Sequence, residues 1–430
     1  MSETERGRLL ARSEEELGRF LDGARPIIAA VKAEGDAALV RFGRDLDGAA
    51  GLTAEGLRVS PSEFAAAEAR VSREVREALA FAVASIRSFH ERQKPEGLWL
   101  DEVHPGVLAG EKATAIPSVA CYVPRGKGAF PSVLMMTTVP ARVAGVPRIV
   151  VLTPPGEDSS VDPATLVAAS MIGVDEIYKV GGAQAVAAVA YGTSTVPRCA
   201  KIVGPGSPWV VAAKQLLAGR IDPGMPAGPS ESIVLADGAA DPRIAAMDLL
   251  IEAEHGPDSS AYLVTDSPAL ARAAHAALPE LCAPLSAERR SYVAAVLGGA
   301  SGGIVLAPDW AEAVRFVNDY APEHLLLLTE EPVATLSQIE HAGEILLGPY
   351  TPFTLANFLL GPNAVLPTSG HARTHSPLGV HDFMKRISVA QVTRAAFPPL
   401  ARHARALALY EGFEAHAAAL GPGRPNFPRG

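Results

Sequence analysis

Residues 118–152 read SVACYVPRGKGAFPSVLMMTTVPARVAGVPRIVVL, in which two short β-branched runs flank a helical stretch. The same alternation continues downstream. It predicts strands at residues 119–123, 148–152, 176–180 and 201–203, and helices at residues 133–144, 163–172, 183–190 and 209–217. Alternation of this kind is typical of β-α-β units, in which helices cover both faces of a mostly parallel sheet. We therefore predict an α/β fold.

A second series of alternating elements follows the stretch 224–229, which is rich in proline and glycine and which we expect to separate two α/β units. Its first helix has a clear start, because Asp241 can cap it and Pro242 suits the first helical position. The pattern predicts strands at residues 232–235, 261–264, 304–306, 325–328 and 345–347, and helices at residues 242–255, 268–278, 309–318 and 332–341. Over the first ~110 residues and again after Leu400, apolar spacing of three and four residues predicts helices.

Composition and charge limit the classes of function. The 430 residues include 38 Lys and Arg against 47 Asp and Glu, a formal charge of -9. A nucleic-acid binder needs a surplus of cations, so we expect no nucleic-acid partner. The three cysteines are widely spaced and form no C-x-x-C pair, a usage typical of reduced compartments. No stretch has the apolar character of a signal peptide or a membrane span, so we expect a soluble, cytoplasmic protein.

Two pairs of titratable residues could carry chemistry. Glu252 and His255 are three residues apart at the end of a predicted helix, so both side chains can reach one ion. An exposed Glu beside a helix-terminal His is the alternative. Glu323 and His324 stand at the end of an apolar strand, where they could share acid-base work or simply cap a polar loop.

Other polar residues have ordinary explanations. Asn357 lies in a stretch of small and apolar residues where a turn is expected, and His416 is expected on the surface of a terminal helix. His371 and His375 are four apart, but Gly370 and Pro377 indicate a loop rather than a helical metal pair.

Two glycine-rich turns, residues 180–184 and 203–207, each follow a predicted strand and precede a helix. Amides exposed at such a turn can bind a phosphate at the helix N-terminus. Neither turn matches G-x-G-x-x-G, and close helix packing explains the glycines nearly as well.

Taken in order, these stretches resemble the histidinol dehydrogenase family, whose members depend on zinc and NAD and complete histidine synthesis. The resemblance runs from about Phe20 to His416. It rests on the matching stretches Tyr122-Val123-Pro124, Val180-Gly181-Gly182-Ala183-Gln184-Ala185, Val203-Gly204-Pro205-Gly206, Ala227-Gly228-Pro229-Ser230-Glu231, Ala253-Glu254-His255, Ala321-Pro322-Glu323-His324-Leu325, Val365-Leu366-Pro367-Thr368 and Ala415-His416.

The resemblance implies two incomplete Rossmann-like α/β domains and a homodimer in which terminal segments are exchanged. The expected parts are an N-terminal arm, residues 1–20, a discontinuous first α/β domain, residues 21–121 and 230–378, a second α/β domain, residues 122–229, and a small helical C-terminal dimerisation domain, residues 379–430.

The resemblance also implies the site residues. Zinc would be held by Glu252, His255, Asn357 and His416, the last reaching the other subunit's site. Acid-base catalysis would fall to Glu323 and His324, and NAD would be held by Tyr122, Gln184 and Ser207. The alcohol substrate would meet Ser230, Glu252, His255, His324, Asn357, Glu411 and His416.

Four positions depart from the family pattern. The family usually has Gln at position 252 and Asp at position 357, so Glu252 and Asn357 exchange one carboxylate for one amide and leave the ligand charge unchanged. Ala364 replaces a histidine and Ser207 replaces an asparagine. A lost polar group near the substrate changes what the pocket can hydrogen-bond, and therefore its specificity.

Three hypotheses follow. The first is oxidation of L-histidinol to L-histidine with two NAD. The second is a family relative that oxidises another small polar alcohol, such as an amino alcohol or a sulfonated diol, with the same zinc and NAD. The third is a non-catalytic metabolite-binding protein on the same scaffold, which Glu323, His324, His255 and His416 argue against.

Overall fold

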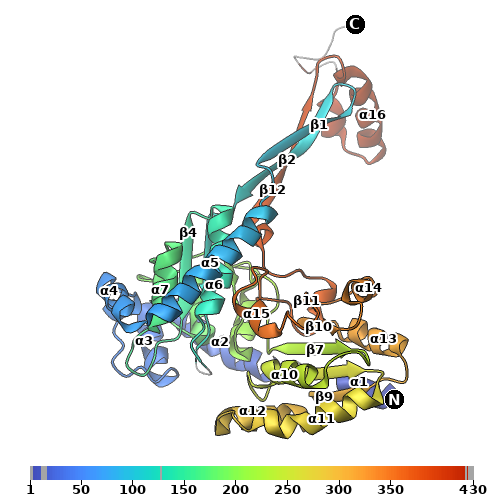
Figure 1. The fold of residues 1–430 in the computed structure, drawn as a ribbon. Helices are drawn as coiled ribbons and strands as arrows, with labels where there is room; N and C mark the ends of the chain where they lie inside the picture. The colour runs from blue at the N-terminus through green and yellow to red at the C-terminus, as the bar shows by residue number, and fades with distance from the viewer. Residues whose placement is uncertain (1–2, 11–16, 126–127, 422–423, 425–430) are drawn as a thin grey trace. The chain divides into compact units, whose positions relative to one another are not determined.

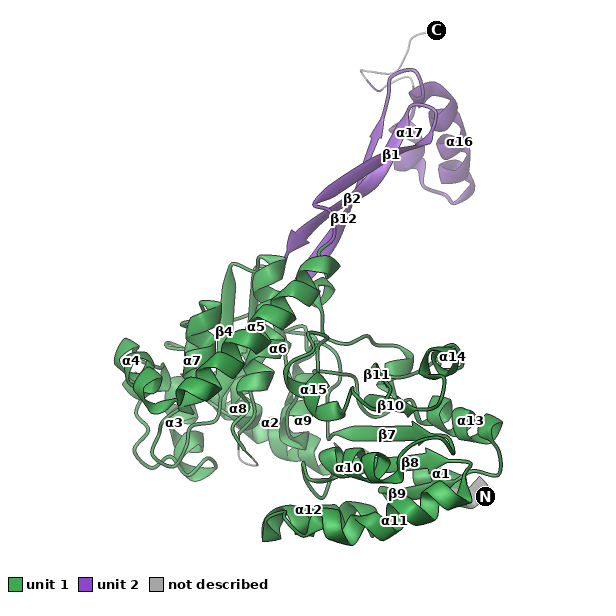
Figure 2. Ribbon diagram, viewed as in Figure 1, with its two compact units in different colours: residues 1–94, 116–383 green, residues 95–115, 384–430 purple. Residues whose placement is uncertain are grey.

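The computed structural model describes residues 3–10, 17–125, 128–421 and 424, and Figure 1 shows their helices and strands. The chain divides into two units (Figure 2). Unit 1 comprises residues 1–94 and 116–383, and unit 2 comprises residues 95–115 and 384–430. The domain boundaries expected from the sequence within this division stay a prediction.

A parallel four-stranded sheet forms the first half of unit 1, in the order β5-β4-β3-β6. Its strands are β3 (Ser118–Tyr122), β4 (Arg148–Thr153), β5 (Ile177–Lys179) and β6 (Lys201–Val203), joined by α6 (Pro131–Ala144), α7 (Pro163–Ile172) and α8 (Gly182–Tyr191), with α9 (Pro208–Leu217) after β6. The strands and helices predicted for this region are confirmed. The strands are almost wholly buried, which is why they read as continuous apolar runs.

The N-terminal helices complete the two helical layers on this sheet. They are α2 (Leu17–Glu34), α3 (Asp36–Asp45), α4 (Pro61–Arg70) and α5 (Arg73–Gln93), whereas α1 (Glu3–Leu10) packs through Leu9 and Leu10 on the second sheet of this unit. Helices α2 and α3 pack with α8 and α9 in one core, and α5 packs against α6 and α7 (Figure 1). The helical prediction for the first part of the chain is therefore confirmed as far as α5.

The second half of unit 1 contains a parallel five-stranded sheet in the order β11-β10-β7-β8-β9. The strands are β7 (Glu231–Ala236), β8 (Ser260–Thr265), β9 (Gly302–Leu306), β10 (His324–Leu328) and β11 (Glu344–Leu347), and the helices are α10 (Pro242–Ala253), α11 (Pro268–Cys282), α12 (Ala287–Leu297), α13 (Trp310–Tyr320), α14 (Pro332–Leu336) and α15 (Phe353–Phe358). Separate apolar cores on its two faces, one built with α10 and the other with α13, show that helices cover both. The predicted cap of α10 is confirmed, because Asp241 accepts hydrogen bonds from the Arg243 and Ile244 amides.

Unit 2 consists of an antiparallel sheet and two helices. The sheet has the order β1-β2-β12, from β1 (Leu98–His104), β2 (Val107–Ala115) and β12 (Met384–Val392), and the helices are α16 (Phe397–Tyr410) and α17 (Glu414–Ala418). The helical prediction for the N-terminal part of the chain is wrong from Leu98 onward, and the C-terminal segment is not purely helical because it contributes β12. These strands are largely exposed, so they lack the buried apolar signature that identified the others.

Two boundaries in unit 1 also need correction. Helix α14 ends at Leu336 rather than at residue 341, and α10 ends at Ala253, two residues before His255.

Among the described residues no helix combines the length and apolarity that a bilayer span requires.

The turn after β6 depends on a glycine and a buried lysine. Gly204 has φ +109°, and a Cβ there would lie 2.2 Å from the Tyr122 carbonyl oxygen, so only glycine lets the two strand ends approach so closely. Lys214 of α9 lies beneath this turn, and its ammonium donates to the Gly204 carbonyl oxygen at 2.7 Å. Burial lowers the pKa of Lys214 to about 8.

The low pKa of Lys214 makes stability depend on pH. An unfolded lysine has a pKa of about 10.4, so between about pH 8 and 10.4 the unfolded chain binds the additional proton and the free energy of unfolding rises with pH. Subtracting the free energy of unfolding of the Lys214→Met variant from that of the wild type cancels the contributions of the other titratable groups. We expect the wild-type minus variant difference in the free energy of unfolding to increase from pH 7.5 to 9.5, measured by denaturant titration. A difference independent of pH would contradict the burial of a charged Lys214.

Candidate functional site

The carboxylate of Glu252 is fully buried near the C-terminal end of α10 and meets two other predicted site residues. Asn357 Nδ2 donates to Glu252 Oε1 at 3.0 Å, and His255 Nδ1 lies 3.0 Å from Glu252 Oε2. Ser230 Oγ is 3.1 Å from the same His255 nitrogen. Four residues predicted from three separate stretches of sequence are thus brought together.

Asn357 reaches this cluster from a short helix, not from the turn that the sequence predicted. Helix α15 is tied to α10 by Asp248, whose Oδ1 accepts a hydrogen bond from the Phe353 amide at 3.2 Å. Asp248 stands one helical turn before Glu252, and burial raises its pKa to about 6. Sequence reasoning missed Asp248, although a carboxylate one turn from Glu252 within an apolar helix was a usable signal.

Glu252 keeps its negative charge despite full burial. Burial disfavours the carboxylate, but the neighbouring His255 and His324 rings and the hydrogen bond from Asn357 hold the pKa of Glu252 below its usual value. Its Oε2 has no hydrogen bond of acceptable geometry among the described residues, although His255 Nδ1 is close. A buried anionic oxygen in this state is suited to bind a cation.

Glu323 and His324 lie at the amino end of β10, next to the amino ends of β7 and β11. Glu323 Oε2 accepts a hydrogen bond from the Glu231 amide at 2.9 Å, and its Oε1 is 3.8 Å from His324 Nε2. The other ring nitrogen, Nδ1, is 2.5 Å from Oε1 of Glu344, a residue that sequence reasoning missed. Both predicted acid-base residues therefore belong to one buried array.

Burial and the charges of neighbouring side chains set the pKa values of Glu323 and His324. Burial raises the pKa of Glu323 to about 8, against the opposing effect of His324. Burial alone would lower the pKa of His324, but three surrounding carboxylates outweigh it and raise this pKa to about 10. They belong to Glu323, Glu252 and Glu344. Because Glu252 acts on both groups, the acid-base pair and the Glu252 cluster form one electrostatic site.

The residues expected to hold a nucleotide gather at the carboxyl end of the four-stranded sheet. Tyr122 ends β3, and its hydroxyl accepts a hydrogen bond from the Gly182 amide at 3.1 Å. Gln184 is buried in the first turn of α8, and its amide nitrogen is 3.5 Å from Asp47 Oδ2. Ser207 precedes α9, and its side chain is not used as a helix cap. The carboxyl ends of parallel strands are where ligands of α/β sheets bind.

Sequence reasoning also missed Asp47, which lies beside Gln184 in this region. Burial raises its pKa to about 6, although the hydrogen bond from Gln184 opposes this shift. It also contributes to raising the pKa of the buried Tyr122 hydroxyl to about 12, an effect due first to burial.

Glu411 and His416 belong to unit 2. Both line a hollow of about 480 Å³ formed by α16, α17 and the residues that follow, together with apolar side chains such as Leu407, Phe413 and Leu420. The predicted helix around His416 is confirmed. Their participation in the site of Glu252 stays a prediction.

Within the described residues, no group of three or more His, Cys, Asp and Glu side chains is arranged to hold a metal ion. The predicted zinc set differs from such a group, because Asn357 contributes an amide and His416 comes from the other unit. His371 and His375 lie in the predicted loop, with ring centroids 5.5 Å apart.

Comparison with known proteins identifies the family. The model of the histidinol dehydrogenase family matches residues 10–421. The chain belongs to this family.

Two curated relatives and one solved structure of this family illustrate the similarity. A histidinol dehydrogenase homolog of Cereibacter sphaeroides is 60% identical over 97% of this chain and 95% of its own. Histidinol dehydrogenase of Synechocystis is 51% identical over 96% and 94%. The crystal structure of histidinol dehydrogenase from Elizabethkingia anophelis superposes with a TM-score of 0.92 at 32% identity, over 98% of this chain and 95% of that one. The protein is therefore a dehydrogenase with the α/β fold of the family.

Proposed function

We propose that this protein oxidises L-histidinol through L-histidinal to L-histidine, using zinc and two molecules of NAD. The observation that carries the proposal is the buried cluster of Glu252, His255 and Asn357 beside the acid-base pair Glu323 and His324, in a chain of the histidinol dehydrogenase family. Oxidation of a primary alcohol to a carboxylic acid removes two hydrides, which accounts for two NAD.

The described donors fit zinc. Two ligand atoms of a tetrahedral zinc, each at about 2.1 Å, lie roughly 3.4 Å apart. The Glu252 Oε2 to His255 Nδ1 separation of 3.0 Å is close to that distance, and Oε2 lacks a hydrogen-bonded partner among the described residues. Glu252, His255 and the amide oxygen of Asn357 would hold the ion, and His416 of a second subunit would complete the set. Bound zinc supplies a Lewis acid for the alcohol oxygen and a positive charge that offsets Glu252.

The remaining residues bind and move protons. His324 in its neutral form accepts the alcohol proton, and Glu323 in its ionised form accepts a proton from the water that hydrates the aldehyde. Ser230, whose Oγ lies 3.1 Å from His255 Nδ1, would bind the substrate beside the ion, and Glu411 would pair with a substrate ammonium. Tyr122, Gln184 and Ser207 hold NAD at the carboxyl end of the four-stranded sheet.

A second candidate is oxidation of a different small polar alcohol, such as an amino alcohol or a sulfonated diol, by the same zinc and NAD chemistry. Four relatives are named histidinol dehydrogenase homolog, and they are 52–60% identical to the chain. The Synechocystis relative, which is named histidinol dehydrogenase, is 51% identical. The chain is thus more similar to the relatives whose names leave the substrate open. Ala364 and Ser207, which replace polar residues usual in the family, also favour an altered pocket.

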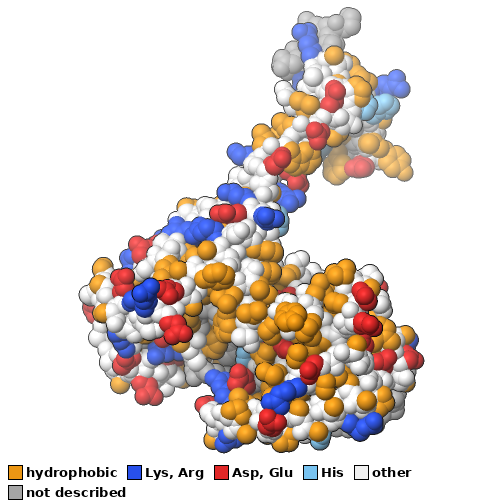
Figure 3. Space-filling view, in the orientation of Figure 1, with side chains coloured by type: hydrophobic (Ala, Val, Ile, Leu, Met, Phe, Trp, Pro, Cys, Tyr) orange, Lys and Arg blue, Asp and Glu red, His pale blue; other side chains and the backbone are white. Residues whose placement is uncertain are grey.

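We further propose a homodimer whose C-terminal segments are exchanged. Unit 2 exposes many large apolar side chains on its strands and helices, as Figure 3 shows, and such surface usually marks an interface. They include Leu98, Trp99, Leu100, Val103, Ile387, Val392, Leu407, Leu409, Tyr410 and Phe413. In this dimer Glu411 and His416 would serve the partner's site.

The exchange of carboxylate and amide between positions 252 and 357 predicts a compensating pair of substitutions. Glu252→Gln removes the only carboxylate of the ligand set and should lower zinc affinity by about 10- to 100-fold. Adding Asn357→Asp restores one carboxylate and should restore about one zinc per chain. Zinc is measured by elemental analysis after dialysis against a weak chelator, with the exposed His275→Ala as control. Equal zinc in the single and double variants would contradict the ligand assignment.

Substrate identity is decided by NAD reduction with the zinc-loaded protein. L-histidinol should yield about two NADH per alcohol, because two hydrides leave each molecule. An amino alcohol and a sulfonated diol are assayed in parallel, together with the Ala364→His variant. Higher kcat/KM for another alcohol than for L-histidinol would favour the second candidate, and no NADH from any alcohol would exclude both.

Mixing two inactive variants tests the shared site. If His416 serves the partner, a heterodimer of His416→Ala and Glu323→Ala chains contains one intact site and one doubly altered site. Random mixing should then restore about a quarter of wild-type activity, because about half of the dimers are mixed and half of their sites are intact. No recovery despite mixed dimers seen by native mass spectrometry would falsify the exchange.

A further inference from the structure

Glu344 is placed beside His324 by the backbone of the edge strand β11. In the parallel pairing of β10 and β11, His324 is the register partner of Glu344. The Gly343 amide donates to the Pro322 carbonyl and the Glu344 amide donates to the Glu323 carbonyl, at 2.8 and 2.9 Å. A Cβ on Gly343 would lie 2.5 Å from the Glu323 oxygen, so glycine at this position allows β11 to approach the acid-base pair.

The side chain of Glu344 fixes the orientation of the His324 ring. Its Oε1 lies 2.5 Å from Nδ1, and the two side chains are only 7% and 4% exposed. Nε2 is thereby turned toward Glu323 Oε1, 3.8 Å away. The ring of Phe353 meets the imidazole edge-on, with centroids 5.8 Å apart and an interplanar angle of 67°.

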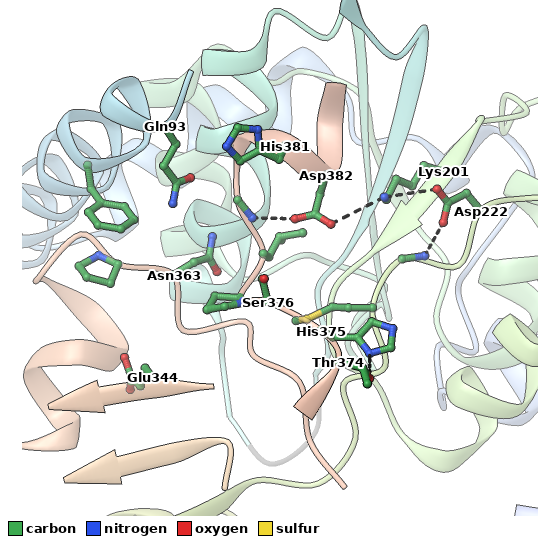
Figure 4. A pocket seen from close by; sticks show the side chains of 17 residues that line it. Gln93, Lys201, Asp222, Glu344, Asn363, Thr374, His375, Ser376, His381 and Asp382 are labelled. Carbon is green, nitrogen blue, oxygen red and sulfur yellow. Dashed lines mark hydrogen bonds and ion pairs between the residues drawn. The ribbon is translucent and has the colours of Figure 1, made fainter. Parts of the chain in front are cut away.

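The described part of the chain offers Glu344 no charged partner other than His324 that could explain its burial. Among the described residues it forms an ion pair with His324 alone, and its Oε2 is buried without a hydrogen-bonded partner. Glu344 also lines a cavity of about 640 Å³, but the ammonium of that cavity, Lys201, pairs with Asp222 and Asp382 instead (Figure 4). A buried carboxylate is costly unless it is paired, so the His324 contact is the interaction that retains it.

We propose that Glu344 is the positioning residue of His324. Its carboxylate accepts a hydrogen bond from Nδ1–H, which leaves Nε2 as the nitrogen that exchanges protons with the substrate. A hydrogen bond at one ring nitrogen sets the tautomer and the orientation of the other. This proposal rests on the proposed function only in taking His324 as the acid-base group, since the contact itself belongs to the fold.

Two substitutions separate the hydrogen bond from the charge. Glu344→Gln keeps an oxygen that can accept from Nδ1, whereas Glu344→Ala removes the acceptor. The exposed Glu340→Gln, four residues earlier, removes the same charge from the surface and serves as control. We expect kcat to fall about tenfold for Gln and about 100-fold for Ala, with KM changed less than about threefold. In a plot of kcat against pH, the limb that reports the pKa of His324 should move to lower pH in both variants. The charged ring then loses the carboxylate of Glu344 and is stabilised by those of Glu323 and Glu252 alone. An unchanged limb and kcat equal to those of Glu340→Gln would overturn the proposal.

A measurement without substrate makes the result independent of the alcohol. Nitrogen-15 NMR of histidine-labelled, zinc-loaded protein, followed over a pH titration, should show that wild-type His324 loses its proton from Nε2 and keeps the proton on Nδ1. In Glu344→Ala the titration should occur at lower pH and leave a mixture of the two neutral tautomers. An unchanged His324 spectrum in a folded Glu344→Ala protein would refute the positioning role. A changed spectrum in a protein that oxidises none of the alcohols would retain that role and refute the proposed function.

Discussion

The buried charge of Glu252 is the constraint on which the site depends. A carboxylate with no exposure to water must be compensated, and here the compensation comes from Asn357, His255 and the nearby His324. These partners arrive on three different elements, so the packing of α10 against α15 and against β7 and β8, with β10 next to β7 in the sheet, also assembles the site. The Asp248 contact with the Phe353 amide contributes to the same end, since it fixes α15 to α10 one turn away.

The two sheets of unit 1 carry the candidate site residues at opposite strand ends. The carboxyl end of the four-stranded sheet presents Tyr122, Gln184 and Ser207 near helix N-termini, where amides favour phosphate. The acid-base array instead occupies the amino ends of β7, β10 and β11, where the helix C-terminus of α10 also lies. A helix C-terminus is electronegative, so this edge favours cations and protonated rings. The raised pKa of His324 agrees with that expectation, although its direct cause is the neighbouring carboxylates.

The sequence predicts strands and helices that have a buried apolar pattern of their own. It does not predict exposed strands that are held in place by pairing with segments far away in the chain. Strands such as β4 and β10 were found because parallel strands buried on both faces are continuous apolar runs. Strand β1 was missed because it is exposed along its whole length and is held by pairing with β2, which in turn pairs with β12 from the far end of the chain. Sequence spacing reveals two pairs of site residues, Glu252 with His255 and Glu323 with His324, because the members of each pair are close in sequence.

Glu344 shows why the rest of the site could not be found in this way. Its relation to His324 comes from strand register and from the absence of a side chain at Gly343, and neither is visible in a spacing of twenty residues. His324 therefore lies between two carboxylates, Glu323 at Nε2 and Glu344 at Nδ1. A ring held on both sides by negative charge retains a proton strongly, whereas a base must be able to stand neutral. A cation at Glu252 would shift this balance toward the neutral ring by offsetting the third carboxylate, so the proposed metal binding would be coupled to the basicity of His324 through charge rather than through a shared bond.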